Sequence, residues 1–564
     1  MNPSTIFHRQ QSEYAFALDD THYVFRLRTG RGEAQKCNFY YADRASMSPG
    51  LEFACVPMVR FREDKYFDWY EVRLETAWER IAYYFELFDG TERLCCYGDC
   101  FEMVGTPDRA DYFQLPFNHR ADRFTAPPWA KDAIVYNIFP DSFANGRQTL
   151  SGHAEDGLGG TLKGIAENLS YIASLGFNCI YLNPIFAAES YHRYDTVDYY
   201  QVDPHLGAKE DLRGLVEKAH SLGLRVILDG VFNHISSSHP FFQDVLEKGS
   251  QSQYHACFYS LPERPRLPAP GEMPGYTCFS YVPNMPKTNT AYPFLRQYFC
   301  DVGTYWIREF GIDGWRLDVA NELDDGFLRA FRQAVKAAKP DALIVGEVWE
   351  NAGHYLGGDM LDSAMNYDFR RYCRRLFAEQ SVDVEIFDAN ISTLLLRYRE
   401  SALFAQLNLL DSHDVSRYLT LCGQDIHKME LSILFQMTFP GMPCVFYGDE
   451  KGLWGAQEPE YRQAMAWNRT HPLEDIYRKL ISLRKSTPAL RYGSFQTVCA
   501  SGGVYRYARA WQDQKITVTM NLGDTPIPAP AQGKILLKKG ESHDIMGPWE
   551  YEVREESTHG GDNL

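Results

Sequence analysis

The sequence has few positive charges, no paired cysteines and no long apolar segment free of helix breakers. Its 57 Lys and Arg residues stand against 74 Asp and Glu residues, which gives a net charge of −17. Because an acidic surface repels phosphate backbones, nucleic acid is excluded as a partner. The 13 cysteines are scattered without a C-x-x-C pair, so neither a zinc site nor a disulfide framework is indicated.

Two further absences concern membranes and secretion. The first residues contain no apolar core segment, so we expect no secretory signal. The uncharged run 431–448 is long enough to cross a membrane, but it contains Gln436, Pro440 and Pro443. We interpret it as a buried helix followed by a buried strand. Together with the cysteine pattern, this predicts a cytoplasmic protein that has no membrane partner.

The composition that remains is that of a folded protein, with 45% apolar residues and 14% aromatic residues. Residues 1–125 contain short apolar runs separated by turn residues. Alternation of apolar and polar residues over 70–74 is typical of a half-buried strand. This pattern predicts an N-terminal β-sandwich module, and Pro127 and Pro128 mark its boundary.

From Ala133 onward, apolar strand-like runs alternate with amphipathic helical patterns. In 162–175, for example, Leu162, Ile165 and Leu169 fall on one helical face. Eight runs have the character of buried parallel strands: 133–139, 178–184, 225–232, 314–319, 343–349, 361–366, 407–413 and 444–449. Eight such units predict an α/β fold, a (β/α)8 TIM barrel spanning 126–490.

Two segments depart from this rhythm. Residues 235–290 follow the third strand, show no helix of the expected period and are rich in Pro, Gly, Ser and Tyr. Because so long a loop without structure is uncommon, we expect a small inserted domain there. Residues 491–564 return to strand-like alternation and predict a C-terminal all-β domain.

Polar residues follow several of the predicted strands, at the barrel edge where active sites are built. Asp229 ends the third strand, Arg316 and Asp318 the fourth, Glu347 the fifth and Asp414 the seventh. A single Asp at a strand end is commonly a helix N-cap or an ion-pair partner. Four such strand ends together indicate buried carboxylates with nucleophilic or acid–base roles. Glycoside hydrolysis is catalysed by a pair of carboxyl groups of this kind. The motifs of competing reactions, such as G-x-S-x-G and H-E-x-x-H, are missing.

These segments resemble the four ordered signature regions of the α-amylase superfamily, glycoside hydrolase family 13. The matching segments are 229–234, 314–318, 346–349 and 412–414, read as DGVFNH, GWRLD, GEVW and SHD. The segment 285–289, MPKTN, resembles a fifth region that is typical of neopullulanases, cyclomaltodextrinases and maltogenic amylases. An N-terminal β module is also typical of that subgroup.

The resemblance implies roles for the carboxylates. Asp318 would be the nucleophile that forms a covalent glucosyl-enzyme, and Glu347 the general acid and then the base. Asp414 would stabilise the transition state, and Arg316 would keep Asp318 ionised. Such a retaining pair should lie about 5 to 5.5 Å apart.

The resemblance also implies a set of sugar-binding residues. His192, Tyr194, His234 and His413 would hold the sugar on the glycone side, and Trp349 would line the acceptor side unless it belongs to the core. Arg417, Glu458 and Arg462 are weaker candidates for the far glycone subsites, because surface ion pairs would explain them nearly as well.

The sequence departs from the family at the calcium site of many relatives. The turn reads Asn145-Gly146-Arg147, and a later position reads Gly160-Thr161, so two oxygen ligands are lost. Because calcium takes six to eight oxygens, we expect no metal and no cofactor. Glu350 and Asp411 add negative charge where relatives often have His and Gly.

The resemblance predicts an enzyme that cleaves α-1,4 bonds of maltooligosaccharides, cyclodextrins or pullulan, with transglycosylation where a sugar replaces water. It also implies a homodimer. Two alternatives stay open: a 4-α-glucanotransferase or glucosyl isomerase of the same superfamily, and a catalytically silent glucan-binding protein.

Overall fold

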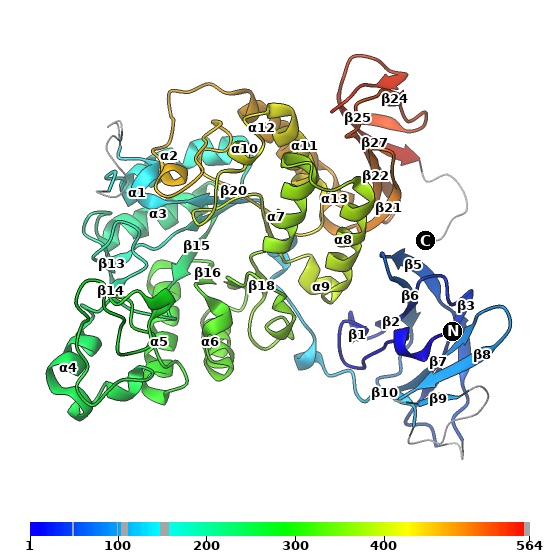
Figure 1. Ribbon diagram of the computed structural model, residues 1–564, viewed down its shortest axis with the longest axis horizontal. Helices are drawn as coiled ribbons and strands as arrows, with labels where there is room; N and C mark the ends of the chain where they lie inside the picture. The colour runs from blue at the N-terminus through cyan, green and yellow to red at the C-terminus, as the bar shows by residue number, and fades with distance from the viewer. Residues whose placement is uncertain (48–49, 99, 103–110, 147–149, 151–156, 558–564) are drawn as a thin grey trace. The chain divides into compact units, whose positions relative to one another are not determined.

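The computed structural model describes residues 1–47, 50–98, 100–102, 111–146, 150 and 157–557 (Figure 1). The chain divides into two compact units. One contains residues 1–125 and 383–403, and the other contains residues 126–382 and 404–564.

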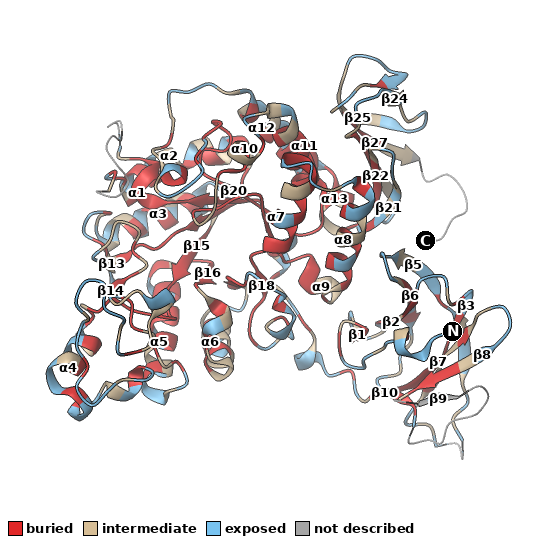
Figure 2. Ribbon diagram, in the orientation of Figure 1, coloured by how far each residue is buried: buried red, intermediate tan, exposed pale blue. Residues whose placement is uncertain are grey.

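The first unit is a sandwich of two antiparallel sheets. One sheet has the order β1-β2-β6-β5, built from Ala15–Ala17, His22–Gly30, Phe67–Glu75 and Val59–Glu63. The other has the order β4-β3-β7-β8-β9, with β10 paired to β7, built from Ala54–Pro57, Lys36–Asp43, Ile81–Phe88, Arg93–Tyr97, Cys100–Glu102 and Phe113–Leu115. Phe25, Phe39 and Tyr83 are fully buried in a shared aromatic core, which shows as red in Figure 2. These alternating rings fix which strand face turns inward.

Two helices from the middle of the chain group with this first unit, although the sequence placed them inside the barrel region. They are α8 (Val384–Leu396) and α9 (Glu400–Leu403). Leu396 packs against Tyr14 and Trp69, and Glu400 pairs with Arg73 at 2.5 Å. The apolar surface of α8 therefore packs against residues that lie more than 300 positions earlier in the chain, which local periodicity does not reveal.

The second unit contains the predicted (β/α)8 barrel. Its strands are β11 (Val135–Ile138), β12 (Cys179–Leu182), β15 (Arg225–Gly230), β16 (Gly314–Leu317), β17 (Leu343–Gly346), β18 (Ser363–Ala364), β19 (Leu407–Leu409) and β20 (Met442–Phe446). All neighbours pair in parallel, in the order β18-β17-β16-β15-β12-β11-β20-β19. A bridge from Met365 to Leu407 joins the two ends, so the sheet closes.

Helices lie outside these strands (Figure 1). The long ones are α2 (Leu162–Leu175), α3 (Lys209–Ser221), α5 (Pro293–Phe310), α6 (Asp325–Ala338), α11 (Ile426–Thr438) and α12 (Pro472–Ser486); α7 (Tyr367–Cys373) is shorter and runs into a π-helix. The connection after β17 departs from the expected unit, because its only helix is the 3₁₀ turn η9 (Ala352–His354). The connection, residues 347–362, has only sixteen residues, and three of them are Gly353, Gly357 and Gly358. Because glycine disfavours helix and the segment is short, it does not form a full helix with a loop at each end.

The predicted insertion follows β15. The expectation that it holds no helix is wrong, because α4 (Pro240–Lys248) lies within it and buries Phe242 and Val245. The helix begins where the His239 side chain accepts from the backbone N–H of Phe241 and Pro240 occupies the first turn. It has only nine residues, so its apolar periodicity is too short to be recognised from the sequence. Beyond α4 the insertion consists of short 3₁₀ turns and single bridges, such as the one between His234 and Lys287.

The chain ends in the predicted β domain. A five-stranded antiparallel sheet has the order β21-β22-β23-β27-β25, built from Ser494–Ser501, Val504–Trp511, Gln514–Asn521, Tyr551–Ser557 and Lys534–Lys539, beside the small pair β24 (Ile527–Pro528) and β26 (Ile545–Met546). The uncharged run 431–448 forms most of α11 and the whole of β20. Within the described residues, no helix is both long and apolar enough to span a membrane.

Candidate active site

Arg316 connects three acidic groups at the carboxyl ends of neighbouring strands. It stands on β16, is 1% exposed, and donates from Nη1 to Asp229 Oδ1 at 2.8 Å and to Asp318 Oδ1 at 2.7 Å. Its Nη2 lies 2.9 Å from Glu347 Oε2. Three carboxyl groups and one guanidinium in so small a buried volume carry a net negative charge, which is costly to bury and indicates a functional site.

Asp229 binds Arg316 and is itself held by two tyrosine hydroxyls. Its Oδ2 accepts hydrogen bonds from the hydroxyls of Tyr181 at 2.6 Å and Tyr194 at 3.1 Å. Tyr181 lies on β12 and Asp229 on the adjacent strand β15. Tyr181 therefore fixes the Asp229 carboxylate, which in turn binds Arg316 on β16. With both oxygens satisfied by donors, Asp229 orients Arg316 and is not available as a nucleophile.

Glu347 follows β17 and receives donors on both of its oxygens. The backbone N–H of Val319 donates to Oε2, and the indole N–H of Trp349 donates to Oε1, each at 2.9 Å. Burial alone would raise the pKa of Glu347, but Arg316 and these two donors lower it below its usual value.

Asp318 and Glu347 both lie against Arg316, at 2.7 and 2.9 Å, so one guanidinium holds the two carboxyl groups beside each other. Burial, together with the charges of Glu347 and Asp229, raises the pKa of Asp318 well above its usual value, despite the opposing Arg316. Because the two groups interact, their protons belong to the pair and are lost from it in two steps.

Asp414 follows β19, the strand that the Met365–Leu407 bridge joins to β18. Its Oδ2 lies 3.0 Å from His413 Nε2, and its Oδ1 lies 3.7 Å from Arg462 Nη2. Burial and the charge of Glu347 raise the pKa of Asp414 to about 7, although Arg316 and Arg462 oppose that shift. The third predicted carboxylate therefore shares the electrostatic field of the first two.

The predicted histidines gather beside this cluster. Burial lowers the pKa of His192 to about 4 and that of His234 to about 3, and holds the pKa of His413 well below its usual value. All three are thus neutral imidazoles near pH 7, suited to exchange hydrogen bonds with hydroxyl groups. His413 stacks on Tyr194 with ring centroids 5.5 Å apart, and His234 stacks on Phe279 at 4.7 Å.

Trp349 is half exposed and lies beside the acid rather than in the core. Its ring stacks on Tyr367 with centroids 3.8 Å apart and an interplanar angle of 8°. One face of the indole is thus covered, and 46% of the residue remains exposed. An exposed aromatic face next to a carboxyl pair can stack on a sugar ring.

Arg462 and Glu458 join the site on the side of Asp414. Arg462 donates from Nε to the carbonyl of His413 at 2.8 Å and from Nη1 to Glu458 Oε1 at 2.6 Å. Tyr191 donates its hydroxyl to the same Glu458 oxygen and accepts from Arg462 at 3.0 Å. Hydrogen bonds and ion pairs therefore connect Tyr191 and Glu458, through Arg462, to Asp414.

Arg417 differs from the expectation for a sugar-binding residue. It is fully buried, and its guanidinium donates to the carbonyls of Tyr447 and Tyr461 and to Asp449. Its partners are two backbone carbonyls and one carboxylate in the segment after β20, so Arg417 supports that segment and presents no exposed atom to a ligand.

Two described residues at the expected calcium position, Gly160 and Thr161, make hydrogen bonds within the protein. The backbone N–H of Gly160 donates to the carbonyl of Asp141 at 2.7 Å. The Thr161 hydroxyl caps α2 by accepting from Gly164. Arg147 lies outside the described residues. Within the described part of the chain, no group of three His, Cys, Asp or Glu side chains could hold a metal ion.

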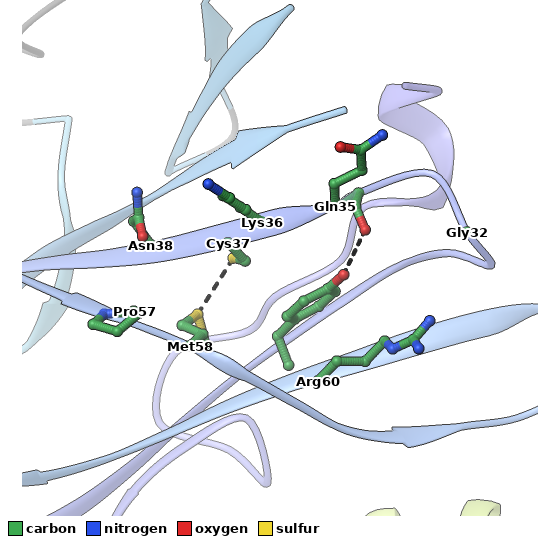
Figure 3. Close-up of a pocket in the computed structure, with 10 residues that line it drawn as sticks. Gly32, Gln35, Lys36, Cys37, Asn38, Pro57, Met58 and Arg60 are labelled. Carbon is green, nitrogen blue, oxygen red and sulfur yellow. Dashed lines mark hydrogen bonds between the residues drawn. The ribbon is translucent and has the colours of Figure 1, made fainter. Parts of the chain in front are cut away.

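A separate hollow of about 850 Å³ lies in the first unit (Figure 3). Tyr70, which lines it, donates to the carbonyl of Ala34, and Lys36 and Arg60 line it as well. None of the predicted catalytic or binding residues lines it, so the chemistry belongs to the barrel edge.

Sequence reasoning missed three residues that shape the site. Asn183 contacts both His413 and Tyr194, Tyr191 donates to Glu458, and Tyr367 stacks on Trp349. Asn183 and Tyr367 lie just after the carboxyl ends of barrel strands, so a complete listing of strand ends would have found them.

Comparisons with known proteins agree with this geometry. Residues 137–492 match the model of the alpha amylase catalytic domain, and residues 1–119 match that of the alpha amylase N-terminal ig-like domain. A cyclomaltodextrinase of Geobacillus thermopakistaniensis is 40% identical over 95% of each chain. Neopullulanase 2 of Thermoactinomyces vulgaris is 40% identical over 92% of this chain and 90% of its own. A solved structure of a cyclomaltodextrinase aligns with a TM-score of 0.91 at 34% identity, covering 98% of this chain and all of the other.

Proposed function

Because the chain belongs to the alpha-amylase family and is an α-glucan hydrolase, we propose that it cleaves α-1,4-glucosidic bonds with retention of configuration. The observation that carries this proposal is the placement of Asp318 and Glu347 on one guanidinium, that of Arg316, at 2.7 and 2.9 Å. An inverting pair would be separated by about 6.5 to 9.5 Å to admit a water molecule. Two carboxyl groups held on one guanidinium lie close together, which favours a covalent intermediate.

The first step needs an ionised Asp318 and a protonated Glu347. The reactive form of the pair therefore carries its one proton on Glu347. Asp318 then attacks the anomeric carbon, and the C–O bond to the leaving sugar breaks as Glu347 protonates its oxygen. Arg316 stabilises the Asp318 carboxylate at 2.7 Å during the attack.

The second step uses the same groups in reverse. Glu347 is now a carboxylate and takes a proton from water or from a sugar hydroxyl as that oxygen attacks the anomeric carbon. The ester bond to Asp318 breaks and restores its carboxylate. Asp414 and the neutral His413 lie where they can bond ring hydroxyls and oppose the positive charge of the transition state.

We assign maltooligosaccharides, cyclodextrins and pullulan as the substrate class, supported by the names of the two 40%-identical relatives. The test is product analysis of the purified protein given β-cyclodextrin, pullulan and soluble starch separately, with Asp318→Asn as the blank. Rapid opening of cyclodextrin with slow attack on starch is expected. No turnover of any of the three by the parent protein would contradict the proposal and favour a transferase, an isomerase or a silent binder.

Three further properties are proposed. We propose a homodimer, tested by light scattering at micromolar concentration, where a monomer would refute it. We propose that no metal is required, because the hydroxyl of Thr161, at the expected calcium position, already accepts a hydrogen bond from the backbone of α2. We also propose a cytoplasmic location, consistent with the free cysteines among the described residues. Expression with a fluorescent tag would show the location.

A further inference from the structure

The indole of Trp349 touches the reactive pair through one specific atom. Its N–H donates to Glu347 Oε1 at 2.9 Å. The stack on Tyr367, with centroids 3.8 Å apart and planes within 8°, fixes the direction of that N–H. Tyr367 follows β18 and Glu347 follows β17, so two adjacent strands set the geometry.

The oxygen that receives this bond is the one left free by the rest of the cluster. Glu347 Oε2 is occupied by the Val319 N–H and lies 2.9 Å from Arg316 Nη2. Oε1 is therefore the atom that protonates the leaving oxygen in the first step and deprotonates the acceptor in the second step. A donor aimed at Oε1 competes with a proton on that atom and favours the carboxylate form.

From this geometry we propose that Trp349 is a positioning residue that holds Glu347 in its carboxylate form, which favours the second, base-catalysed step. The inference rests on the proposed retaining hydrolysis. In the first step the Glu347 proton passes to the leaving oxygen as Asp318 bonds the anomeric carbon. In the second step Oε1 takes the acceptor proton while the indole N–H already points at it.

Other charged and titratable groups also face Glu347, and the proposal has to hold against them. Arg316 and Asp318 lie on and after β16, Asp229 at the end of β15, and Asp414 after β19. Tyr367 faces it from the start of α7. A substitution that removes only the indole N–H leaves all of these in place, so any change in the titration of Glu347 belongs to that bond.

The test variant is Trp349→Phe, which keeps an aromatic ring on Tyr367 and loses the donor. The alkaline limb of kcat/KM for maltotriose reports loss of the last proton of the Asp318–Glu347 pair in the free enzyme, the proton that Glu347 must carry for the first step. Losing one donor to a carboxylate should move that limb upward by about one pH unit. The second step should slow, so a burst of the first product is expected before the steady state.

Trp511→Phe is the matched control, because Trp511 lies on β22 in the C-terminal domain with 41% of its surface exposed. Its pH profile should superpose on that of the parent. Trp349→His, which restores an N–H donor, should return the limb toward its original position. An unmoved limb in Trp349→Phe, with only a higher KM, would overturn the inference and make Trp349 a stacking platform.

A second measurement covers the case in which Trp349→Phe turns over too slowly to follow. Infrared titration of the carboxylate bands, with Glu347→Gln subtracted, reads the protonation of Glu347 without substrate. An upward shift supports the inference, and an identical titration refutes it. Absence of α-glucan hydrolysis by the parent enzyme would instead refute the proposed function, so the two failures are distinguishable.

Discussion

Asp414→Asn should make the protein more stable at alkaline pH while it loses activity. In the folded protein, burial and Glu347 raise the pKa of Asp414 to about 7, whereas an unfolded Asp titrates at about 3.9. Between these two values the folded state keeps a proton that the unfolded state has lost. The free energy of unfolding therefore falls as pH rises through this window, and the loss is complete above pH 7.

The size of the effect follows from the shift. About three pH units correspond to roughly 4 kcal/mol at most. Because the Asp414 side chain is 25% exposed, solvent reduces this to about 2 kcal/mol. Asn stays neutral at every pH, so Asp414→Asn should match the parent at pH 4 and exceed it by about 2 kcal/mol at pH 8. For a unit of this size, that is a rise in Tm of about 2 °C.

The assay is thermal unfolding of both proteins at pH 4 and pH 8, together with kcat on maltotriose. We expect kcat to fall by about 10³-fold, because a charge aimed at the transition state is lost. Asp301→Asn, on the exposed surface of α5, is the matched control and should leave both Tm values and kcat unchanged. An Asp414→Asn protein that is no more stable than the parent at pH 8 would refute the electrostatic reasoning.

Three other substitutions or treatments give definite expectations. Arg316→Met leaves Asp229, Asp318 and Glu347 without their cation, so it should cost about 3 to 5 kcal/mol of folding free energy, measured by urea unfolding; unchanged stability would contradict the assigned ion pairs. Arg509→Met removes a fully buried guanidinium that bonds the carbonyls of Leu490, Gly493 and Ser494, so Tm should fall while kcat of the folded protein stays constant. Dialysis against a chelator should change neither Tm nor activity, and loss of either would show that a metal is held after all.

The barrel and its catalytic edge could be predicted because they depend on local patterns. Buried parallel strands are continuous apolar runs, and the residue that follows each run faces the same edge of the sheet. Arg316 and Asp318 lie two apart on one strand, so their shared direction follows from strand geometry alone. The structure brings Asp318, Glu347 and Asp414 to that edge together.

What the sequence could not show depends on contacts between distant segments. The grouping of α8 with the first unit requires Leu396 to meet Tyr14 and Trp69, and no local pattern encodes that meeting. Arg417 looks like a polar residue near the site, yet its side chain turns inward to Asp449. The donor role of Trp349 depends on a side-chain angle that Tyr367 fixes.

The most direct test of the central claim is to trap the covalent intermediate. The purified enzyme would be incubated with a fluorinated α-glucosyl fluoride that forms the intermediate quickly and releases it slowly, and then digested for mass spectrometry. The account predicts one added sugar, on the peptide that contains Asp318, and none in Asp318→Asn. A sugar attached to any other residue, or steady turnover to products of inverted configuration, would contradict it.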